Sequence, residues 1–142
     1  MERLKYLVDT NIWLELLLNQ KKADVVQRFF QIIPTAELAI SEFTVCSMGI
    51  ILTRLDKPGV WRDFVTDVFE NGAIRRIALD PAGLREIIEV QQKFRLDFDD
   101  AYQYVAAQRY SLALISFDSD LDKTFLGRKS PEDILAGIAA PL

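Results

Sequence analysis

The fold class follows from one segment near the N-terminus, Leu4-Lys5-Tyr6-Leu7-Val8-Asp9-Thr10-Asn11-Ile12-Trp13. Residues 4–8 form a short, mostly apolar run, and the Asp-Thr-Asn cluster that ends it is typical of helix N-caps. Ile12, Trp13, Leu16 and Leu17 then recur at a spacing that places them on one face of a helix. A strand, a polar turn and a helix in this order predict the opening unit of an α/β fold.

The same alternation continues along the rest of the 142-residue chain. Residues 38–40, 73–79 and 112–116 are further short apolar segments typical of buried strands, and helical patterns lie between them. Ser41 and Asp80-Pro81 are helix starts. The sequence shows no repeat and no linker. We therefore expect one domain over residues 1–142, an α/β/α sandwich around a parallel sheet of four to five strands.

The composition excludes several kinds of catalytic site. The chain has no histidine, which excludes Ser-His-Asp and Cys-His catalysis and histidine-ligated zinc. Its single cysteine, Cys46, excludes an intrachain disulfide and lies in an apolar helical pattern, where we expect it to be buried. Carboxylate, lysine, arginine, tyrosine and hydroxyl groups are left to perform any chemistry.

The charge and the hydropathy pattern limit the partners and the compartment. The net charge is -4 and the pI is about 4.9, so a nucleic acid would have to meet a local basic patch or a bound cation. Asp9 and Asn11 interrupt the first apolar run, which is therefore no signal peptide. No segment reaches the roughly 20 apolar residues of a membrane span. We expect a cytoplasmic protein without a membrane segment.

Acidic residues stand at the ends of the predicted strands. Asp9 directly follows the first strand and Asp118 directly follows the last one. Asp99 and Asp100 open the helix that precedes the last strand. Because ligands of open parallel sheets bind beyond the carboxyl ends of the strands, these three segments are predicted to place acids in one crevice.

Helix capping could explain each aspartate alone, and Asp97 with Asp100 resembles a capping arrangement. Helix capping explains the three aspartates together less well, because two carboxylates about 4 Å apart repel by about 4 kcal/mol at an effective dielectric constant of 20. A divalent cation is the expected compensator, and oxygen ligands favour Mg²⁺ or Mn²⁺. Such a metal lowers the pKa of a bound water and offsets phosphate charge, which is the chemistry of phosphodiester hydrolysis.

Three motifs, in this order, resemble those of the PIN-domain ribonucleases and of the VapC-type toxins among them. The motifs are Val8-Asp9-Thr10-Asn11-Ile12, Asp100-Ala101-Tyr102-Gln103-Tyr104-Val105-Ala106-Ala107 and Ile115-Ser116-Phe117-Asp118-Ser119-Asp120. The first motif is weak alone, whereas the three together match over nearly the whole chain. The resemblance implies a PIN-like α/β/α fold, Mg²⁺- or Mn²⁺-dependent endoribonuclease activity, and the toxin role in a type II toxin–antitoxin pair.

The resemblance also implies roles for particular residues. Asp9, Asp100 and Asp118 would be the catalytic metal ligands, and Asn11, or Thr10 through its hydroxyl, would help to hold the site. The partners would be an RNA substrate, an antitoxin whose basic tail pairs with the acids, and a second copy in a homodimer. From the sequence itself, the basic pair Arg128 and Lys129 is the best candidate for RNA-phosphate contact.

One position departs from the family pattern. The helix after the second strand usually carries Ser/Thr-x-x-Thr-x-x-Glu, and Ser47 stands here at the glutamate position. Glu42 could reach the site from the helix start, the Ser47 hydroxyl could replace the glutamate, or Asp120 could supply the missing charge. Without such compensation, the chain would be a PIN-fold binding module with weak or no catalysis.

Another phosphoryl-transfer protein is the remaining alternative. A phosphatase of the haloacid-dehalogenase type needs a second aspartate two residues after the first, where this chain has Asn11. A receiver-like domain needs a lysine near the end of a later strand, and Lys123 is poorly placed for that role.

Overall fold

The computed structural model describes residues 3–139, which form a four-stranded parallel sheet. Its order is β3-β2-β1-β4, with bounds β1 Tyr6–Val8, β2 Leu38–Ser41, β3 Arg75–Ile77 and β4 Ala113–Ile115. In the central strand β1, Tyr6 pairs with Leu38 on one side and with Ala113 on the other. A parallel bridge between Ile115 and Lys129 adds one pairing beyond β4. The predicted parallel α/β sheet is confirmed.

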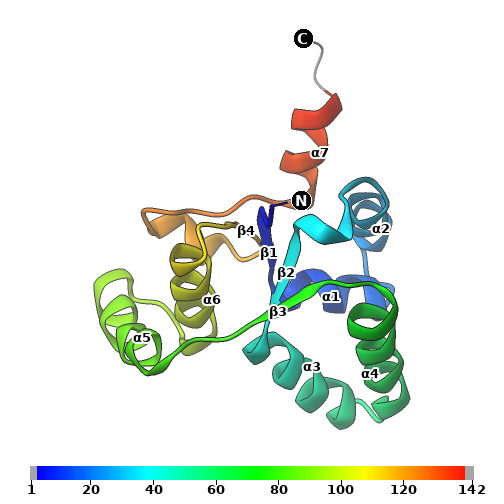
Figure 1. The fold of residues 1–142 in the computed structure, drawn as a ribbon, viewed down its shortest axis with the longest axis horizontal. Helices are drawn as coiled ribbons and strands as arrows, with labels where there is room; N and C mark the ends of the chain where they lie inside the picture. The colour runs from blue at the N-terminus through cyan, green and yellow to red at the C-terminus, as the bar shows by residue number, and fades with distance from the viewer. Residues whose placement is uncertain (1–2, 140–142) are drawn as a thin grey trace.

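Helices cover both faces of this sheet (Figure 1). One layer consists of α5 (Pro81–Phe94) and α6 (Phe98–Arg109), and the other contains α1 (Thr10–Leu17), α2 (Ala23–Ile32) and α4 (Pro58–Val65). Helix α3 (Glu42–Arg54) continues directly from β2, and α7 (Pro131–Ala139) contacts α2 and projects from the body. Short helical turns occupy Thr35–Glu37, Thr66–Asn71 and Ser119–Lys123.

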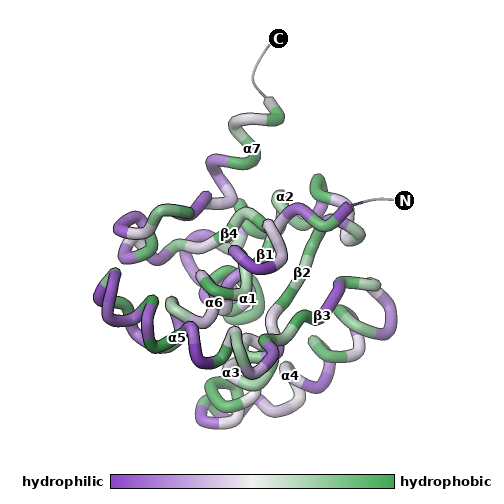
Figure 2. The backbone as a smooth tube through the Cα atoms, turned by 60° about the vertical axis from the view of Figure 1, so that its left-hand side comes forward, coloured by the Kyte–Doolittle hydropathy of each residue, from purple (hydrophilic) through white to green (hydrophobic). Residues whose placement is uncertain are grey.

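Each face of the sheet packs into its own apolar cluster. Leu7 belongs to the cluster under α5 and α6, whereas its neighbour Val8 belongs to the cluster under α1, α2 and α4. Successive side chains of a strand point to opposite faces, which gives this division. Strand β2 is mostly hydrophobic along its length (Figure 2), and all four of its residues are buried. The sandwich therefore has three layers, as expected.

The predicted helix starts are confirmed, although one expected capping arrangement is not formed. The side chains of Asp9, Ser41 and Asp80 each accept a backbone N–H at the start of their helix. Asp97 precedes α6 without a side-chain hydrogen bond to it, so the expected Asp97–Asp100 capping arrangement is not formed. The Asp100 carboxyl is consequently available for other interactions.

Two burial patterns differ from expectation. Cys46 is exposed, because α3 turns Thr44, Val45 and Met48 toward the interior instead. Helix α6 is buried on every side from Asp100 to Ala107, since it lies between the sheet and α5.

Of the helices within residues 3–139, none has both the length and the hydropathy that a bilayer span requires.

Candidate active site at the carboxyl edge of the sheet

The structure brings the predicted acids together at the carboxyl ends of β1 and β4. The Asp9 N–H donates to the Ile115 carbonyl at 2.9 Å, which fixes Asp9 beside the end of β4. Asp118 follows β4 by three residues, and Asp100 lies in the first turn of α6. A cleft of about 200 Å³ is lined by these three acids and by Thr10, Asn11, Leu14 and Asp99.

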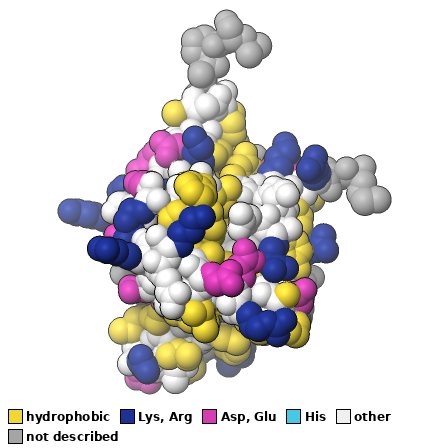
Figure 3. Space-filling view, turned by 90° about the vertical axis from the view of Figure 1, so that its left-hand side faces the viewer, with side chains coloured by type: hydrophobic (Ala, Val, Ile, Leu, Met, Phe, Trp, Pro, Cys, Tyr) yellow, Lys and Arg dark blue, Asp and Glu magenta, His cyan; other side chains and the backbone are white. Residues whose placement is uncertain are grey.

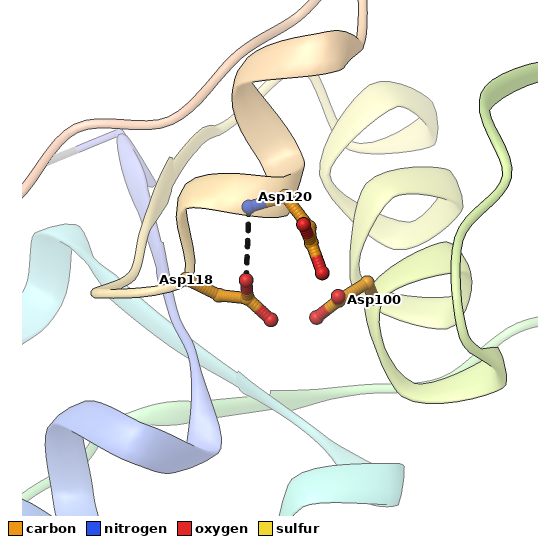
Figure 4. A group of neighbouring side chains, drawn as sticks. All are labelled: Asp100, Asp118 and Asp120. Carbon is orange, nitrogen blue, oxygen red and sulfur yellow. Dashed lines mark hydrogen bonds between the residues drawn. The ribbon is translucent and has the colours of Figure 1, made fainter.

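Three of the carboxyl groups at this edge are close enough to share one cation. One oxygen each of Asp100, Asp118 and Asp120 lies within 4.8 Å of the others, and Figure 4 shows the three side chains converging from α6 and from the turn Ser119–Lys123. Asp118 Oδ1 accepts the Asp120 N–H at 2.9 Å, which orients the Asp118 side chain. We call these three residues the acid cluster.

Asp9 lies deeper than the acid cluster, and protein donors surround its carboxylate. Its side chain is only 6% exposed. Oδ1 accepts the Thr10 N–H at 2.8 Å and the Gln103 Nε2–H at 2.9 Å, and Oδ2 accepts the Ser116 hydroxyl at 2.7 Å. Burial raises the pKa of Asp9 and these hydrogen bonds oppose the rise. Asp9 therefore joins α1, α6 and the end of β4 around one carboxylate.

The pKa of Asp100 is raised as well. Burial raises its pKa to about 8, assisted by a hydrogen bond to the Asp118 carboxyl and by the nearby charges of Asp118, Asp9 and Asp120. A neutral Asp100 can donate a proton to the Asp118 carboxylate, and this shared proton reduces the repulsion between them. The proton occupies the electrostatic role that a cation would fill.

The donor set fits a hard divalent cation. Every candidate ligand atom is a carboxylate oxygen, which suits Mg²⁺ or Mn²⁺. Asp100 and Asp118 line the cleft and belong to the acid cluster, so they are the residues best placed to hold such an ion. Asp9 lines the same cleft from below.

Of the accessory candidates, Asn11 and Asp120 lie at the site. The Asn11 amide donates to Ser116 Oγ at 3.1 Å, and its oxygen accepts the Phe117 N–H at 3.1 Å, so Asn11 ties the start of α1 to the loop after β4. Asp120 belongs to the acid cluster. Its carboxylate adds a charge beside Asp100 and Asp118, as one of the sequence alternatives supposed.

Glu42 and Ser47 do not line the cleft, to which no residue of α3 contributes within the described chain. Glu42 Oε2 lies 3.3 Å from Arg76 Nε, so its charge is directed toward β3. Thr44 is the α3 residue that reaches the interior of the site, where its hydroxyl accepts from Gln103 Nε2 at 2.7 Å. Neither Glu42 nor Ser47 therefore takes the place of the missing glutamate in the cleft.

The basic pair proposed for RNA contact, Arg128 and Lys129, lies in the segment that returns to pair with β4. Arg128 Nε lies 3.1 Å from Asp122 Oδ1, and Arg128 Nη1 donates to the Ser116 carbonyl at 3.2 Å. Lys129 is exposed, and its backbone pairs with β4. Arg128 thus serves the structure of the loop, while the role of the pair in RNA binding stays a prediction.

Gln103, Ser116 and Thr44 are site residues to which sequence reasoning assigned no role. Gln103 is 1% exposed, and its amide nitrogen bridges Asp9 Oδ1 and Thr44 Oγ1. The available signal was its place one turn after Asp100, on the face of α6 that carries the acid. Ser116 donates to Asp9 and accepts the Asp118 N–H at 3.0 Å, a contact that the spacing Ser-Phe-Asp allows.

An apolar cavity of about 380 Å³ lies elsewhere in the molecule, between α1, α2 and α4. Its walls include Trp13, Phe30 and Phe64, and its rim carries Asp63 and Asp67. Among these residues Trp13 Nε1 is buried without a hydrogen-bond partner. This cavity contains none of the predicted catalytic residues, three of which line the smaller acidic cleft instead.

Solved structures share this fold at low sequence identity. A toxin–antitoxin complex from Klebsiella pneumoniae matches with a TM-score of 0.69 and 20% identity, over 89% of this chain and 98% of that one. The sarcin–ricin-loop-cleaving toxin VapC20 of Mycobacterium tuberculosis matches with a TM-score of 0.71 and 15% identity, over 82% and 92%. FitAcB from Neisseria gonorrhoeae matches with a TM-score of 0.69 and 18% identity, over 89% and 98%. A sequence comparison with curated proteins gave no match.

A family model settles the relationship that the motifs indicated. The model of the PIN domain matches residues 6–125. This range begins at β1 and ends just after the turn Ser119–Lys123, so it includes all four strands, the cleft and the acid cluster. The chain belongs to the PIN domain family.

Proposed function

We propose that the protein is a Mg²⁺- or Mn²⁺-dependent endoribonuclease that acts as the toxin of a toxin–antitoxin pair. The observation that carries the proposal is the convergence of Asp100, Asp118 and Asp120 beside the buried Asp9. Membership of the PIN domain family supports nuclease activity, and similarity in fold to a toxin–antitoxin complex and to an RNA-cleaving toxin supports the biological role.

The chain's own residues would hold the reacting groups in place. Asp100 and Asp118 would hold the metal, with Asp120 beside them and Asp9 below them, and when bound the ion would activate water and offset charge on the scissile phosphate. Gln103, Ser116 and the Thr10 N–H fix the Asp9 carboxylate through the hydrogen bonds given above. The rigid carboxylate then gives the cleft a defined shape before substrate enters.

Thr10 would supply a hydrogen-bond donor to the substrate. Thr44 Oγ1 accepts from Gln103 Nε2 at 2.7 Å and from the Ser41 hydroxyl at 3.2 Å, so its own proton is directed to Thr10 Oγ1, 2.9 Å away. Thr10 lines the cleft, and its proton is left to point into it. A phosphate oxygen is the acceptor that this donor would meet.

The proposed partners follow from the same site. An arginine on an antitoxin tail would pair with the acid cluster and block access to it, as charge-assisted hydrogen bonds to carboxylates are strong. A homodimer is proposed from the resemblance to the family. Cytoplasmic localisation is likewise proposed from the resemblance to the family.

Cleavage of single-stranded RNA in the presence and absence of metal tests the function. We expect cleavage with Mg²⁺ or Mn²⁺, none with excess EDTA, and recovery when the metal is restored, because the cation would activate the attacking water and offset the phosphate charge. Gel analysis of an end-labelled RNA measures the products, and the Asp9→Asn variant is the control for contaminating nuclease. Equal cleavage by both proteins would defeat the proposal, and intact RNA under all metal conditions would favour a binding module.

Metal binding is expected to depend on pH through Asp100. Because its pKa is about 8, this carboxyl must lose a proton before it can coordinate, so Mn²⁺ affinity should rise about tenfold per pH unit up to about pH 8 and then level off. Calorimetric titrations at pH 6, 7, 8 and 9 measure this slope. Repeating the pH 7 titration in buffers of different ionisation enthalpy should show release of about one proton. A flat affinity across this range would contradict the assignment of Asp100 as a ligand.

A further inference from the structure

An exposed phenylalanine among basic side chains lies close to the acid cluster. Phe125, in the loop after the turn Ser119–Lys123, is 80% exposed. The Lys93 ammonium lies 4.5 Å from the centroid of the Phe125 ring and 5.5 Å from that of Phe94. The Phe94 ring meets Phe125 edge to face, with centroids 5.2 Å apart. Two contacts from the end of α5 therefore hold this exposed ring in place.

Lys123 links the end of α5 to the acid cluster. Lys123 Nζ donates to the Arg95 carbonyl at 3.1 Å and lies 4.0 Å from Asp120 Oδ1. Arg95, exposed and in the left-handed conformation, ends α5 two residues after Lys93. We define the Phe125 patch as Lys93, Arg95, Lys123 and Phe125. Figure 3 shows the face that carries α5 and α6, where basic side chains lie beside a small hydrophobic group.

The charges of this patch are largely uncommitted. Within residues 3–139, neither Lys93 nor Arg95 forms an ion pair, and Lys123 has only the exposed 4.0 Å contact with Asp120. By contrast, Arg128 in the neighbouring segment is paired with Asp122. The chain has a net charge of -4, and the Phe125 patch gathers three cations beside Glu86 and Glu89, which line the pocket that Lys93 and Phe125 share. It is the kind of surface that an acidic nuclease needs in order to hold a polyanion.

We propose that the Phe125 patch binds single-stranded RNA, with one base stacked on Phe125 and the backbone phosphates contacting Lys93, Arg95 and Lys123. The proposal rests on the proposed function, since the acid cluster next to Lys123 is where that strand would be cut. Aromatic rings among cations are the common means of binding single strands without strict sequence preference. Lys93 covers one face of the Phe125 ring, and the exposure of the side chain leaves room for a base on the other.

Phe125→Ala tests the stacking contact. Binding is measured by fluorescence anisotropy of a labelled ten-nucleotide single-stranded RNA in EDTA, where no cleavage occurs. We expect affinity to fall about tenfold or more, as loss of a stacking platform generally does, while Phe125→Trp retains it. Leu126→Ala is the matched control, because Leu126 is the adjacent apolar side chain and is 42% exposed. Its RNA affinity should stay that of the original protein.

Salt dependence separates the phosphate contacts from the stack. Lys93→Ala and Lys123→Ala should each reduce the slope of log affinity against log salt by about 0.7, whereas Phe125→Ala should lower affinity at unchanged slope. RNA affinity equal in Phe125→Ala and in the original protein would overturn the proposal. Equal losses in Phe125→Ala and Leu126→Ala would also overturn it, as would a change in self-association without a change in RNA affinity.

The experiment distinguishes failure of this inference from failure of the proposed function. If RNA is cleaved in Mg²⁺ but Phe125→Ala has the same KM as the original protein, the Phe125 patch is not the RNA site and the nuclease assignment stands. If no cleavage is seen but Phe125→Ala still weakens RNA binding in EDTA, the patch binds RNA and the catalytic proposal fails.

Discussion

Asp118→Asn is expected to lower metal-dependent RNA cleavage by at least about a hundredfold, since loss of even an indirect metal partner commonly costs up to that much. The substitution removes a charge from the acid cluster and from the cleft. It should leave the fold intact, because the asparagine oxygen can still accept the Asp120 N–H that Asp118 Oδ1 accepts now. Initial rates on end-labelled RNA, with melting temperatures of both proteins in EDTA, measure the two effects.

Asp122→Asn is the matched control for this prediction. It makes the same change in the same short helical turn, but Asp122 pairs with Arg128 and lies outside the acid cluster. Cleavage should therefore change by less than about threefold, as expected of a surface ion pair. If the two variants lose activity equally, or if Asp118→Asn retains full activity, the acid cluster is not the catalytic centre.

Asp100→Asn is expected to stabilise the metal-free protein at pH 8. The pKa of Asp100 is about 8 in the folded chain and near 3.8 when unfolded, so folding retains a proton that the unfolded chain releases between these values. The stabilising contribution of the Asp100 proton is therefore fully present below about pH 4. It is lost as pH rises toward 8, by up to about 1.4 kcal/mol per pH unit. Asparagine avoids this cost and can still donate to Asp118.

Thermal melts in EDTA at pH 4.5 and at pH 8 measure this effect. The melting temperature of Asp100→Asn should exceed that of the original protein by about 5 °C or more at pH 8, and the difference should shrink toward pH 4.5. Asp99→Asn, in the same first turn but exposed, should show no such gain. Excess Mg²⁺ should reverse the order, because only the original protein gains a ligand contact from Asp100. A loss of stability in Asp100→Asn at pH 8 would contradict the account of the site.

The sequence was sufficient to place the acids on the fold because local rules govern that placement. Asp9 and Asp118 follow apolar strands, and Asp100 opens a helix, so parallel-sheet geometry alone directs all three to one edge. The helix starts at Ser41 and Asp80 were equally local, since each cap depends on a side chain and a backbone group within three residues. The roles of the acids in catalysis remain predictions.

Contacts between distant segments could not be derived in the same way. The Gln103–Thr44 hydrogen bond joins residues 59 positions apart, and it depends on how α6 and α3 rotate against the sheet. The same rotation exposes Cys46 and keeps Ser47 out of the cleft, although the helical pattern itself was recognised. The exposure of Phe125 could not be predicted either. An aromatic side chain is usually assigned to the core, and only the three-dimensional path of its loop shows that this one is exposed.

The pairing of β1 with β4 has a consequence for biosynthesis. Strand β1 lies inside the sheet, yet its partner β4 at residues 113–115 is synthesised long after it, since Val8 pairs with Ile115. Such long-range parallel pairing forms slowly. A nascent chain that ends before residue 118 carries Asp9 without Asp118 or Asp120, so the acid cluster cannot assemble until those residues have been made.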